Sequence, residues 1–133
     1  MMGKDTATLE LVLAHELTPT VFHCTTGKDR TGWTAATFLS LLGVDRSDVY
    51  REYLLTNDRL VPSLKPVFDE FAAAGGDPAL LQPILGVDKV YLDTAFGRLE
   101  EVYGTVERYF DEGLGIDLDA QKALRARFLV DPV

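Results

Sequence analysis

The feature that most constrains the fold is a single strand-like stretch in a chain whose other segments carry helical patterns. Thr20–His23 is rich in β-branched and aromatic residues and follows Pro19. A lone strand leaves its backbone N–H and C=O groups without partners, and even an isolated pair of strands is marginal. We therefore expect something to flank this strand: another chain, a distorted helical packing, or a segment outside these 133 residues.

Apolar spacing and capping residues predict six or seven helices around that strand. The helical stretches, in chain order, are Thr6–Leu17, Thr31–Leu42 closed by Gly43, a helix capped by Asp45, a proline-interrupted helix over Asn57–Ala74, a short helix after Asp77, a helix from Asp88 to about Tyr103 that resumes at Thr105, and a last helix capped by Asp117 with Leu118, Leu124 and Phe128 inward. No repeat or linker interrupts them, so we expect residues 1–133 to form one domain.

Composition and charge exclude several classes of protein. The chain is 47% hydrophobic and 26% charged, which is typical of a soluble globular domain. A net charge of −8 disfavours a surface for nucleic acid, and no apolar run approaches the roughly 20 residues of a membrane-spanning helix. One cysteine allows neither an internal disulfide nor a cysteine metal cluster. The N-terminus lacks the pattern of a secretory signal, so we expect a cytoplasmic protein.

A polar loop follows the strand and carries the only cysteine. Cys24 stands at the strand end, and Arg30 follows where a helix is predicted to begin. A helix N-terminus and nearby cations lower the pKa of a thiol from about 8.5 to between about 3.5 and 7.5. Gly27 permits the backbone angles that turn loop amides inward around an anion. The Arg30 guanidinium can donate two hydrogen bonds to phosphoryl oxygens. The spacing therefore predicts an ionised sulfur beneath an oxyanion.

These groups suit phosphoryl transfer to sulfur. We expect Cys24 to attack phosphorus, the loop amides and Arg30 to hold the equatorial oxygens, and water then to release phosphate from a phosphocysteine. The leaving oxygen needs a proton from a nearby carboxylic acid, and Thr31 can donate its hydroxyl to the departing sulfur. Phe22 and Asp29 stand where a nucleotide-binding P-loop needs glycine and serine or threonine. Arsenate reduction would need further thiols.

Residues 23–32, which read HCTTGKDRTG, resemble the signature loop of cysteine-dependent phosphatases. They look most like the loop H-C-x-x-G-K-D-R-T-G of the atypical bacterial and fungal tyrosine-protein phosphatases. Tyr53–Asn57 and Tyr103–Gly115 are similar to stretches that recur late in that family. The resemblance covers essentially the whole chain but only the family's C-terminal half, and the longer N-terminal region of that family supplies most of a central β-sheet. It implies an α/β fold of the cysteine-phosphatase type, represented here mostly by helices with one central strand.

The resemblance also implies a role for each residue of the loop. Cys24 is then the phosphocysteine nucleophile, Arg30 the phosphate clamp and Asp29 the general acid. Lys28 is similar to the loop lysine of lipid-directed phosphatases, so phosphoinositides join phosphotyrosine proteins as expected substrates. Dual specificity that includes phosphoserine and phosphothreonine is a further expectation. The substrate-binding positions, with His23 supporting the loop, are Thr25, Thr26, Gly27, Lys28, Thr31 and Gly32. Residues 58–85 are the candidate lid.

Plainer interpretations stay open at these positions. Cys24 can be an inert buried thiol, Asp29 can cap the helix or form an ion pair, and Lys28 can simply be exposed. The incomplete sheet favours a second class of function, which is an inactive phosphate-binding fragment or an interaction module that needs a complementary N-terminal segment. A homo-oligomer that completes the sheet is a further expectation. The sequence implies neither a cofactor nor a metal.

Overall fold

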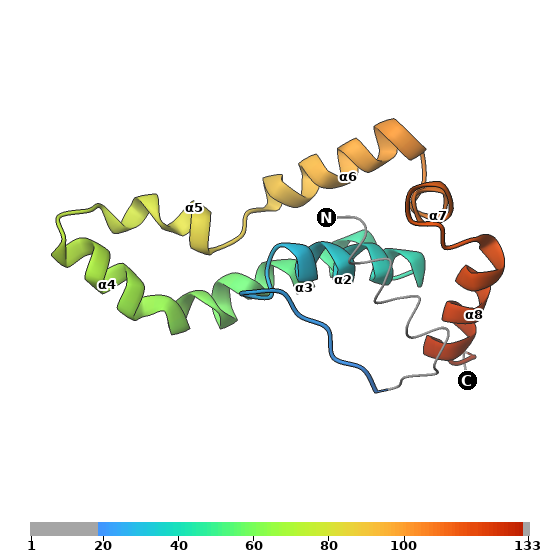
Figure 1. Cartoon of the computed structure of the whole chain (residues 1–133), viewed down its shortest axis with the longest axis horizontal. Helices are drawn as coiled ribbons and strands as arrows, with labels where there is room; N and C mark the ends of the chain where they lie inside the picture. The colour runs from blue at the N-terminus through green and yellow to red at the C-terminus, as the bar shows by residue number, and fades with distance from the viewer. Residues whose placement is uncertain (1–18, 132–133) are drawn as a thin grey trace.

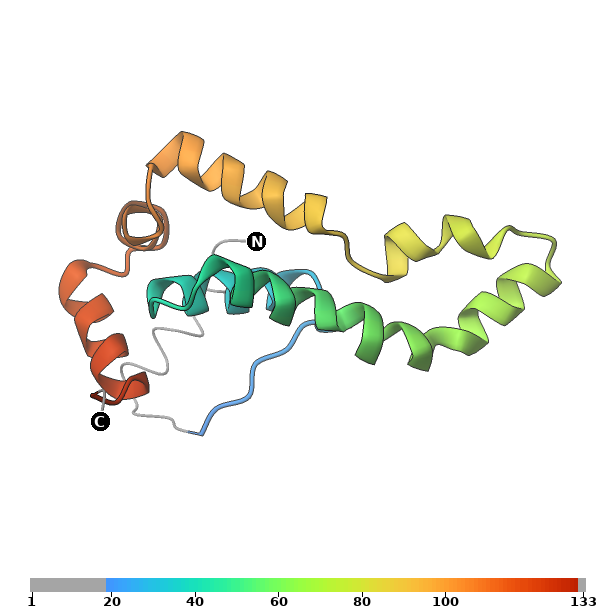
Figure 2. The same cartoon turned by 180° about the vertical axis from the view of Figure 1, so that it is seen from behind.

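The computed structural model of the protein describes residues 19–131 as an assembly of helices. Helices α2 (Arg30–Leu41) and α3 (Arg46–Arg59) lie antiparallel and side by side, and α6 (Lys89–Tyr103) runs back along α3 (Figure 1; Figure 2). The other elements are the 3₁₀-helices η1 (Val61–Leu64) and η2 (Pro78–Leu80), the α-helices α4 (Lys65–Ala73), α5 (Gln82–Leu85), α7 (Val106–Arg108) and α8 (Leu118–Phe128), and the π-helix η3 (Tyr109–Gly113). Within this range no helix is both long and apolar enough to cross a bilayer.

The strand predicted over Thr20–His23 is not formed in the part of the chain that the structure describes. These residues follow an extended path into the loop (Figure 1), and Val21 is 90% exposed. A strand is defined by ladder hydrogen bonds to a neighbouring strand, and residues 19–131 place no such neighbour beside this segment. The α/β class with one central strand is therefore not confirmed. The helix predicted over Thr6–Leu17 lies outside the described residues.

Aspartates set three helix starts as the sequence predicts. The carboxylates of Asp77, Asp88 and Asp117 each accept a hydrogen bond from a backbone amide at the starts of η2, α6 and α8. Such bonds satisfy N–H groups that have no partner inside the helix. Asp45 precedes α3 as predicted, although its side chain makes no capping bond. Gly104 ends α6 with a φ of 83°, a conformation that favours glycine.

The core forms where α2, α3 and α6 meet the C-terminal helices. Its buried side chains include Leu41, Val49, Leu92, Phe96, Leu99, Phe110, Ile116 and Leu124. The Trp33 indole packs against this cluster and donates a hydrogen bond to the Tyr109 hydroxyl at 3.2 Å. Leu124 is buried as predicted, but Leu118 is 59% exposed, so its inward placement was wrong. Six residues of α-helix turn through about 600°, and the two leucines therefore face different sides.

Phe128 lies between these two outcomes. Its ring stacks edge-on against Phe38 with 5.2 Å between ring centroids, yet 41% of the residue is exposed. The predicted inward placement of Phe128 is therefore only partly confirmed.

Between α3 and α6 the chain runs out as an arm, residues 60–86, that turns and comes back (Figure 1). The Asn57 side chain joins the two ends of the arm. Its Nδ2 donates to the Val87 carbonyl at 2.8 Å, and its Oδ1 accepts from the Val87 amide at 2.9 Å. Gly86 fits beside this pair because a Cβ there would lie 2.7 Å from the Asn57 oxygen. The Asn57 amide therefore links the end of α3 to the start of α6 at the root of the arm, and the Tyr91 hydroxyl of α6 also donates to the Pro83 carbonyl in the arm at 2.7 Å.

We expect Asn57→Ala to lower the free energy of unfolding by about 2 kcal/mol, because the buried N–H and C=O of Val87 would both lose their partner. Urea denaturation monitored by circular dichroism measures the change. Asp58→Ala, at the exposed neighbouring position, is the matched control and should change stability by less than about 0.5 kcal/mol. Equal stability of the two variants would show that the Asn57 bonds do not hold the arm.

Candidate active site

The loop of residues 24–29 joins the extended segment to α2 and curls around the Cys24 sulfur. Gly27 has a φ of 76°, which is the left-handed conformation that glycine adopts without strain. The helix begins at Arg30, where the Trp33 amide donates to the Asp29 carbonyl at 2.9 Å. The predicted order of extended segment, loop and helix start is thus present, although the helix begins one residue earlier than predicted.

Hydrogen bonds make the Cys24 thiol unusually acidic. Burial would raise its pKa, but the Thr31 hydroxyl and the amides of Thr31, Gly27 and Thr26 all donate to the sulfur. Together these donors lower the pKa from its usual 9.0 to about 6. At pH 7 about nine-tenths of the sulfur is then thiolate, against about one-hundredth for an unperturbed thiol. The Cys24 sulfur is therefore mostly ionised at neutral pH.

We expect the rate of Cys24 alkylation by iodoacetamide to rise with pH and to reach a plateau, because only the thiolate reacts. The midpoint of this rise should lie near pH 6. In Thr31→Ala the sulfur keeps the backbone donors but loses the hydroxyl, so the midpoint should move up by about one pH unit. Thr94→Ala, which removes a hydroxyl on α6, should leave the midpoint unchanged. Mass spectrometry of quenched samples gives the rates. A midpoint near 8.5 in the unaltered chain would contradict this description of the loop.

Arg30 lies over the same loop as the cysteine. Its guanidinium Nη2 donates to the Thr25 hydroxyl at 3.3 Å, and the Thr34 hydroxyl donates to the Arg30 carbonyl at 2.9 Å. The first contact aims the guanidinium across the loop instead of along α2. A planar guanidinium in this place has further N–H groups to offer an anion.

Lys28 and Asp29 form an ion pair at the rim of the loop. The Lys28 ammonium donates to both carboxylate oxygens of Asp29, each at 2.9 Å. Lys28 is 8% exposed, whereas 62% of the Asp29 side chain is exposed. Lys28 is therefore not the freely solvated side chain that one sequence interpretation allowed. Asp29 holds the N-cap position of α2 without a capping bond, which leaves its carboxylate at the mouth of the loop.

His23 braces the loop from the other side. Its Nδ1 lies 3.0 Å from the Cys24 carbonyl, and because a carbonyl only accepts, this nitrogen carries the hydrogen. Among the described residues no group of His, Cys, Asp and Glu side chains could hold a metal ion. The loop gathers hydrogen-bond donors around one sulfur, and such a donor set suits an anion.

Tyr53 lies beside the loop, although the sequence marked it only as part of the family-like stretch Tyr53–Asn57. Its ring packs on Gly32, where an added Cβ would lie 3.3 Å from the ring carbon Cε2. Burial, followed by the negative charge of Asp29, raises the pKa of Tyr53 to about 12. Tyr53 also lines a cavity of about 160 Å³ between α2 and α3, together with Gly27 and Thr31. The sequence signal that could have revealed this contact is the glycine in the first turn of α2, which leaves room for an aromatic residue of α3.

Comparison with known proteins agrees with this geometry. Residues 4–130 match the tyrosine phosphatase family. A Cupriavidus necator protein named "putative tyrosine-protein phosphatase" is 36% identical over 98 residues, which cover 74% of this chain and 36% of that protein. The triple specificity protein phosphatase PtpB of Mycobacterium tuberculosis is 33% identical over 109 residues, which cover 72% of this chain and 39% of PtpB.

The chain thus spans less than two-fifths of the length of each of these curated relatives. The family match, in contrast, extends over nearly all of the chain and includes the whole loop from His23 to Gly32. The acidic thiol, the glycine turn and the guanidinium all lie inside that match. On this evidence the chain belongs to the tyrosine phosphatase family.

Proposed function

We propose that this chain carries the catalytic loop of a protein-tyrosine phosphatase that hydrolyses phosphomonoesters through a phosphocysteine on Cys24. The observation that carries the proposal is the sulfur with a pKa of about 6, surrounded by the donors of Thr31, Gly27 and Thr26. Release of p-nitrophenol from p-nitrophenyl phosphate by the purified chain tests it. The phosphoryl group should also be found on Cys24 when turnover is stopped by acid and the chain is analysed by mass spectrometry.

In the first step the Cys24 thiolate attacks phosphorus opposite the ester oxygen. The S–P bond forms as the P–O bond to the leaving group breaks, and the leaving oxygen takes a proton. Arg30 and the loop amides donate to the three remaining phosphoryl oxygens, where negative charge is held in the transition state. The positive end of the α2 dipole adds to this stabilisation because the loop opens onto the helix N-terminus.

In the second step water attacks the phosphocysteine. A P–O bond to the water oxygen forms as the S–P bond breaks, the electron pair returns to sulfur, and inorganic phosphate leaves with the protons of the water. The Thr31 hydroxyl, which donates to the sulfur in the free site, stabilises the departing thiolate. The same hydrogen bonds that make Cys24 a nucleophile at neutral pH thus make it a good leaving group.

Asp29 is proposed as the general acid for the leaving oxygen. Its carboxylate lies at the loop mouth, where the Lys28 ammonium holds both oxygens. A phosphate dianion entering the loop gives Lys28 another acceptor, so one carboxylate oxygen becomes free to carry and deliver a proton.

We expect Asp29→Asn to slow hydrolysis of a phosphoserine peptide by about 10²-fold or more, because an alkoxide needs the proton. Hydrolysis of p-nitrophenyl phosphate should fall much less, by less than about fivefold, since p-nitrophenolate leaves without protonation. Steady-state kcat/KM values on the two substrates measure the difference. Asp119→Asn, at an exposed position on α8, is the matched control. Equal losses on both esters would remove Asp29 from this role.

We propose phosphotyrosine proteins and phosphoinositides as substrates of the loop, with phosphoserine and phosphothreonine proteins as dual-specificity substrates. Lys28 adds a second cation beside Arg30, and its ammonium is already held at the rim by Asp29. A polyphosphorylated headgroup presents anionic groups next to the scissile one, which two cations can bind together. Loss of phosphoinositide hydrolysis in Lys28→Met, with phosphotyrosine hydrolysis retained, would assign Lys28 to headgroup binding.

A second candidate function is a phosphate-binding module that turns over only with a complementary polypeptide. The extended segment before Cys24, which lacks a strand neighbour in residues 19–131, favours it. We also propose that residues 58–85, most of which lie in the arm, act as a lid within a single domain. Leu80 and Ile84 are 63% and 64% exposed there and offer apolar surface to a substrate or to the loop.

A further inference from the structure

The Tyr53 hydroxyl is a polar group beside the loop that the proposed phosphoryl transfer does not use. It has no hydrogen-bond partner among the described residues, although Tyr53 is half-buried against the core. A tyrosine hydroxyl that is withdrawn from water usually donates to an acceptor, because the loss of its hydrogen bonds to water has a cost. An acceptor for this hydrogen is therefore expected nearby in at least one state of the site.

Packing holds Tyr53 against the first turn of α2. Its ring lies on Gly32, where an added Cβ would be 3.3 Å from the ring carbon Cε2, and it lines the cavity of about 160 Å³ with Gly27 and Thr31. Asp29 stands three positions before Gly32, and its backbone angles, φ −89° and ψ −79°, lie in the helical region. Residues three apart on a helix are neighbours on its surface. Asp29 therefore belongs to the face of α2 that Tyr53 covers.

Of the charged groups around Tyr53, Asp29 acts on the hydroxyl most strongly. Burial, then the charge of Asp29, and then Tyr91 and Asp88 raise the pKa of Tyr53 to about 12. Because the Coulomb interaction weakens with distance, this order favours Asp29 as the acceptor. The other two groups already have hydrogen-bond roles, since Asp88 caps α6 and the Tyr91 hydroxyl donates to Pro83 in the arm.

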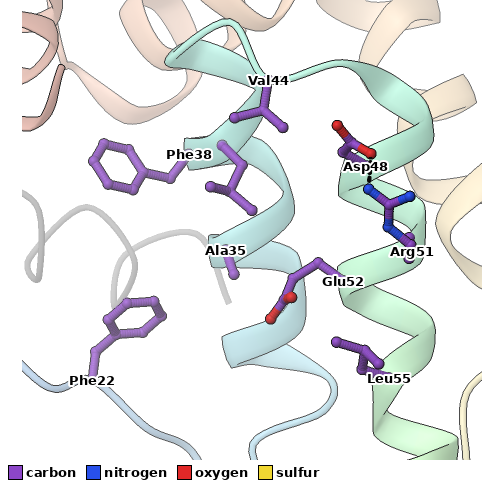
Figure 3. A pocket seen from close by; sticks show the side chains of 9 residues that line it. Phe22, Ala35, Phe38, Val44, Asp48, Arg51, Glu52 and Leu55 are labelled. Atoms are coloured by element: carbon purple, nitrogen blue, oxygen red, sulfur yellow. Dashed lines mark hydrogen bonds and ion pairs between the residues drawn. The ribbon is translucent and has the colours of Figure 1, made fainter. Parts of the chain in front are cut away.

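Glu52, the carboxylate next to Tyr53 in the sequence, is not a competing acceptor. In Figure 3 its side chain points into a hollow of about 610 Å³ between α2 and α3, and Tyr53 does not line this hollow. Glu52 also borders the smaller cavity behind the loop, but it is not among the groups that shift the pKa of Tyr53. The arrangement therefore favours Asp29.

We propose that Tyr53 is the positioning residue for Asp29, whose carboxyl group it orients by a hydrogen bond once a phosphate group occupies the loop. This inference rests on the proposed phosphatase function and on Asp29 as its general acid. In the free chain the Lys28 ammonium binds both Asp29 oxygens at 2.9 Å. When Lys28 turns to the phosphate, the exposed Asp29 side chain can accept from the Tyr53 hydroxyl, which leaves its other oxygen facing the leaving group.

The hydrogen bond from Tyr53 contributes most in the transition state. The protonated oxygen of Asp29 gives its proton to the leaving oxygen as the P–O bond breaks, and negative charge develops on the carboxyl group. A hydrogen bond to a charged acceptor is stronger than one to a neutral acceptor, so the Tyr53 hydroxyl stabilises Asp29 more at that moment than before it. Tyr53 itself stays protonated, because its pKa is about 12.

We expect Tyr53→Phe to lower kcat/KM for a phosphotyrosine peptide about tenfold, because one charge-assisted hydrogen bond is lost while the ring stays on Gly32. The value for p-nitrophenyl phosphate should change less than about twofold, since p-nitrophenolate leaves without a proton. The midpoint of Cys24 alkylation should remain near pH 6. Tyr103→Phe removes the hydroxyl of a half-buried tyrosine that packs on Tyr109, and as the matched control it should change neither ester.

A double-mutant cycle tests whether the effect passes through Asp29. In Asp29→Asn, the addition of Tyr53→Phe should lower kcat/KM for the phosphotyrosine peptide by less than about twofold further, because the group that Tyr53 positions is gone. In Asp88→Asn, which keeps an oxygen to cap α6, the full effect of Tyr53→Phe should persist.

A crystal structure of the Cys24→Ser chain with inorganic phosphate tests the contact without turnover, so it stays separate from the proposed function. We expect phosphate in the loop and a distance of about 2.7 Å between Tyr53 Oη and a carboxylate oxygen of Asp29. This contact in a chain that does not hydrolyse esters would support the positioning of Asp29 and contradict only the activity of the isolated chain. A loop without phosphate would contradict the proposed function, on which the inference rests.

Three results would overturn the inference. One is a phosphate-bound structure in which Asp29 still pairs with Lys28 alone or Tyr53 donates to another acceptor. Another is that Tyr53→Phe has no effect, lowers the values for both esters equally or shifts the Cys24 midpoint, since a group that supports the loop as a whole would act in that way. The last is that the double variant loses as much again as Tyr53→Phe alone, which would mean that the hydroxyl acts without Asp29.

Discussion

Cys24→Ser is expected to reduce kcat for p-nitrophenyl phosphate by at least about 10⁴-fold, because it removes the nucleophile itself. The four hydrogen bonds at this position can hold a thiolate with a pKa of about 6, but a serine hydroxyl ionises far too weakly to become an alkoxide there. Inorganic phosphate should still bind, since the loop amides and Arg30 remain. Initial rates of p-nitrophenol release, together with phosphate titration by calorimetry, measure both quantities.

The control for this experiment is Ser47→Ala, a change on the exposed side of α3 that should leave kcat within about twofold. Activity that persists in the serine variant would contradict the assignment of Cys24. An unaltered chain that binds phosphate but does not turn over, and gains activity with a complementary polypeptide, would instead favour the second candidate function.

Arg30→Lys is expected to lower kcat/KM by about 10³-fold while the charge of the loop stays the same. The guanidinium, which the Thr25 hydroxyl holds across the loop, can donate two parallel hydrogen bonds to phosphoryl oxygens. An ammonium donates from a single point and cannot match both oxygens of the transition state. Steady-state kinetics with p-nitrophenyl phosphate measure the loss.

Arg98→Lys, an exposed exchange on α6, is the matched control and should have no effect on kcat/KM. A loss of less than about tenfold in Arg30→Lys would mean that charge alone suffices and that the paired geometry is not used. Addition of guanidinium ion should not rescue the lysine variant but should partly rescue Arg30→Ala, because only the smaller side chain leaves room for it.

The loop and the helix ends were predictable because their determinants are local. Gly27 and Gly104 have the backbone conformations that favour glycine, and Asp88 and Asp117 cap the helices that follow them. Such effects depend on residues within one turn of chain, and a sequence displays them directly. The Cys24 environment belongs to the same class, because all its donors lie within seven residues of it.

Other contacts join distant parts of the chain, and the sequence does not pair them. The hydrogen bonds between the Asn57 side chain and the Val87 backbone join residues 30 positions apart, and neither residue type alone predicts them. Tyr53 reaches the loop only because α3 packs antiparallel to α2. The prediction of a strand over Thr20–His23 was wrong for a related reason. Residue type indicates a tendency toward an extended backbone, but a strand also needs a neighbouring strand, and the described residues do not provide one.

The reactivity of the sulfur and the selection of substrates by the arm depend on separate parts of the chain. The acidity of the sulfur is set within eight consecutive positions, 24–31, whereas the arm is joined to the helices at its root, by the Asn57 amide and by the Tyr91 hydroxyl, which donates to the Pro83 carbonyl at 2.7 Å. Remodelling the arm, by shortening it or exchanging it for another sequence between positions 60 and 86, should leave the alkylation midpoint of Cys24 where it is. Such chimaeras would differ in which phosphate esters they admit and not in how readily sulfur displaces oxygen, so selectivity and reactivity can be engineered one at a time.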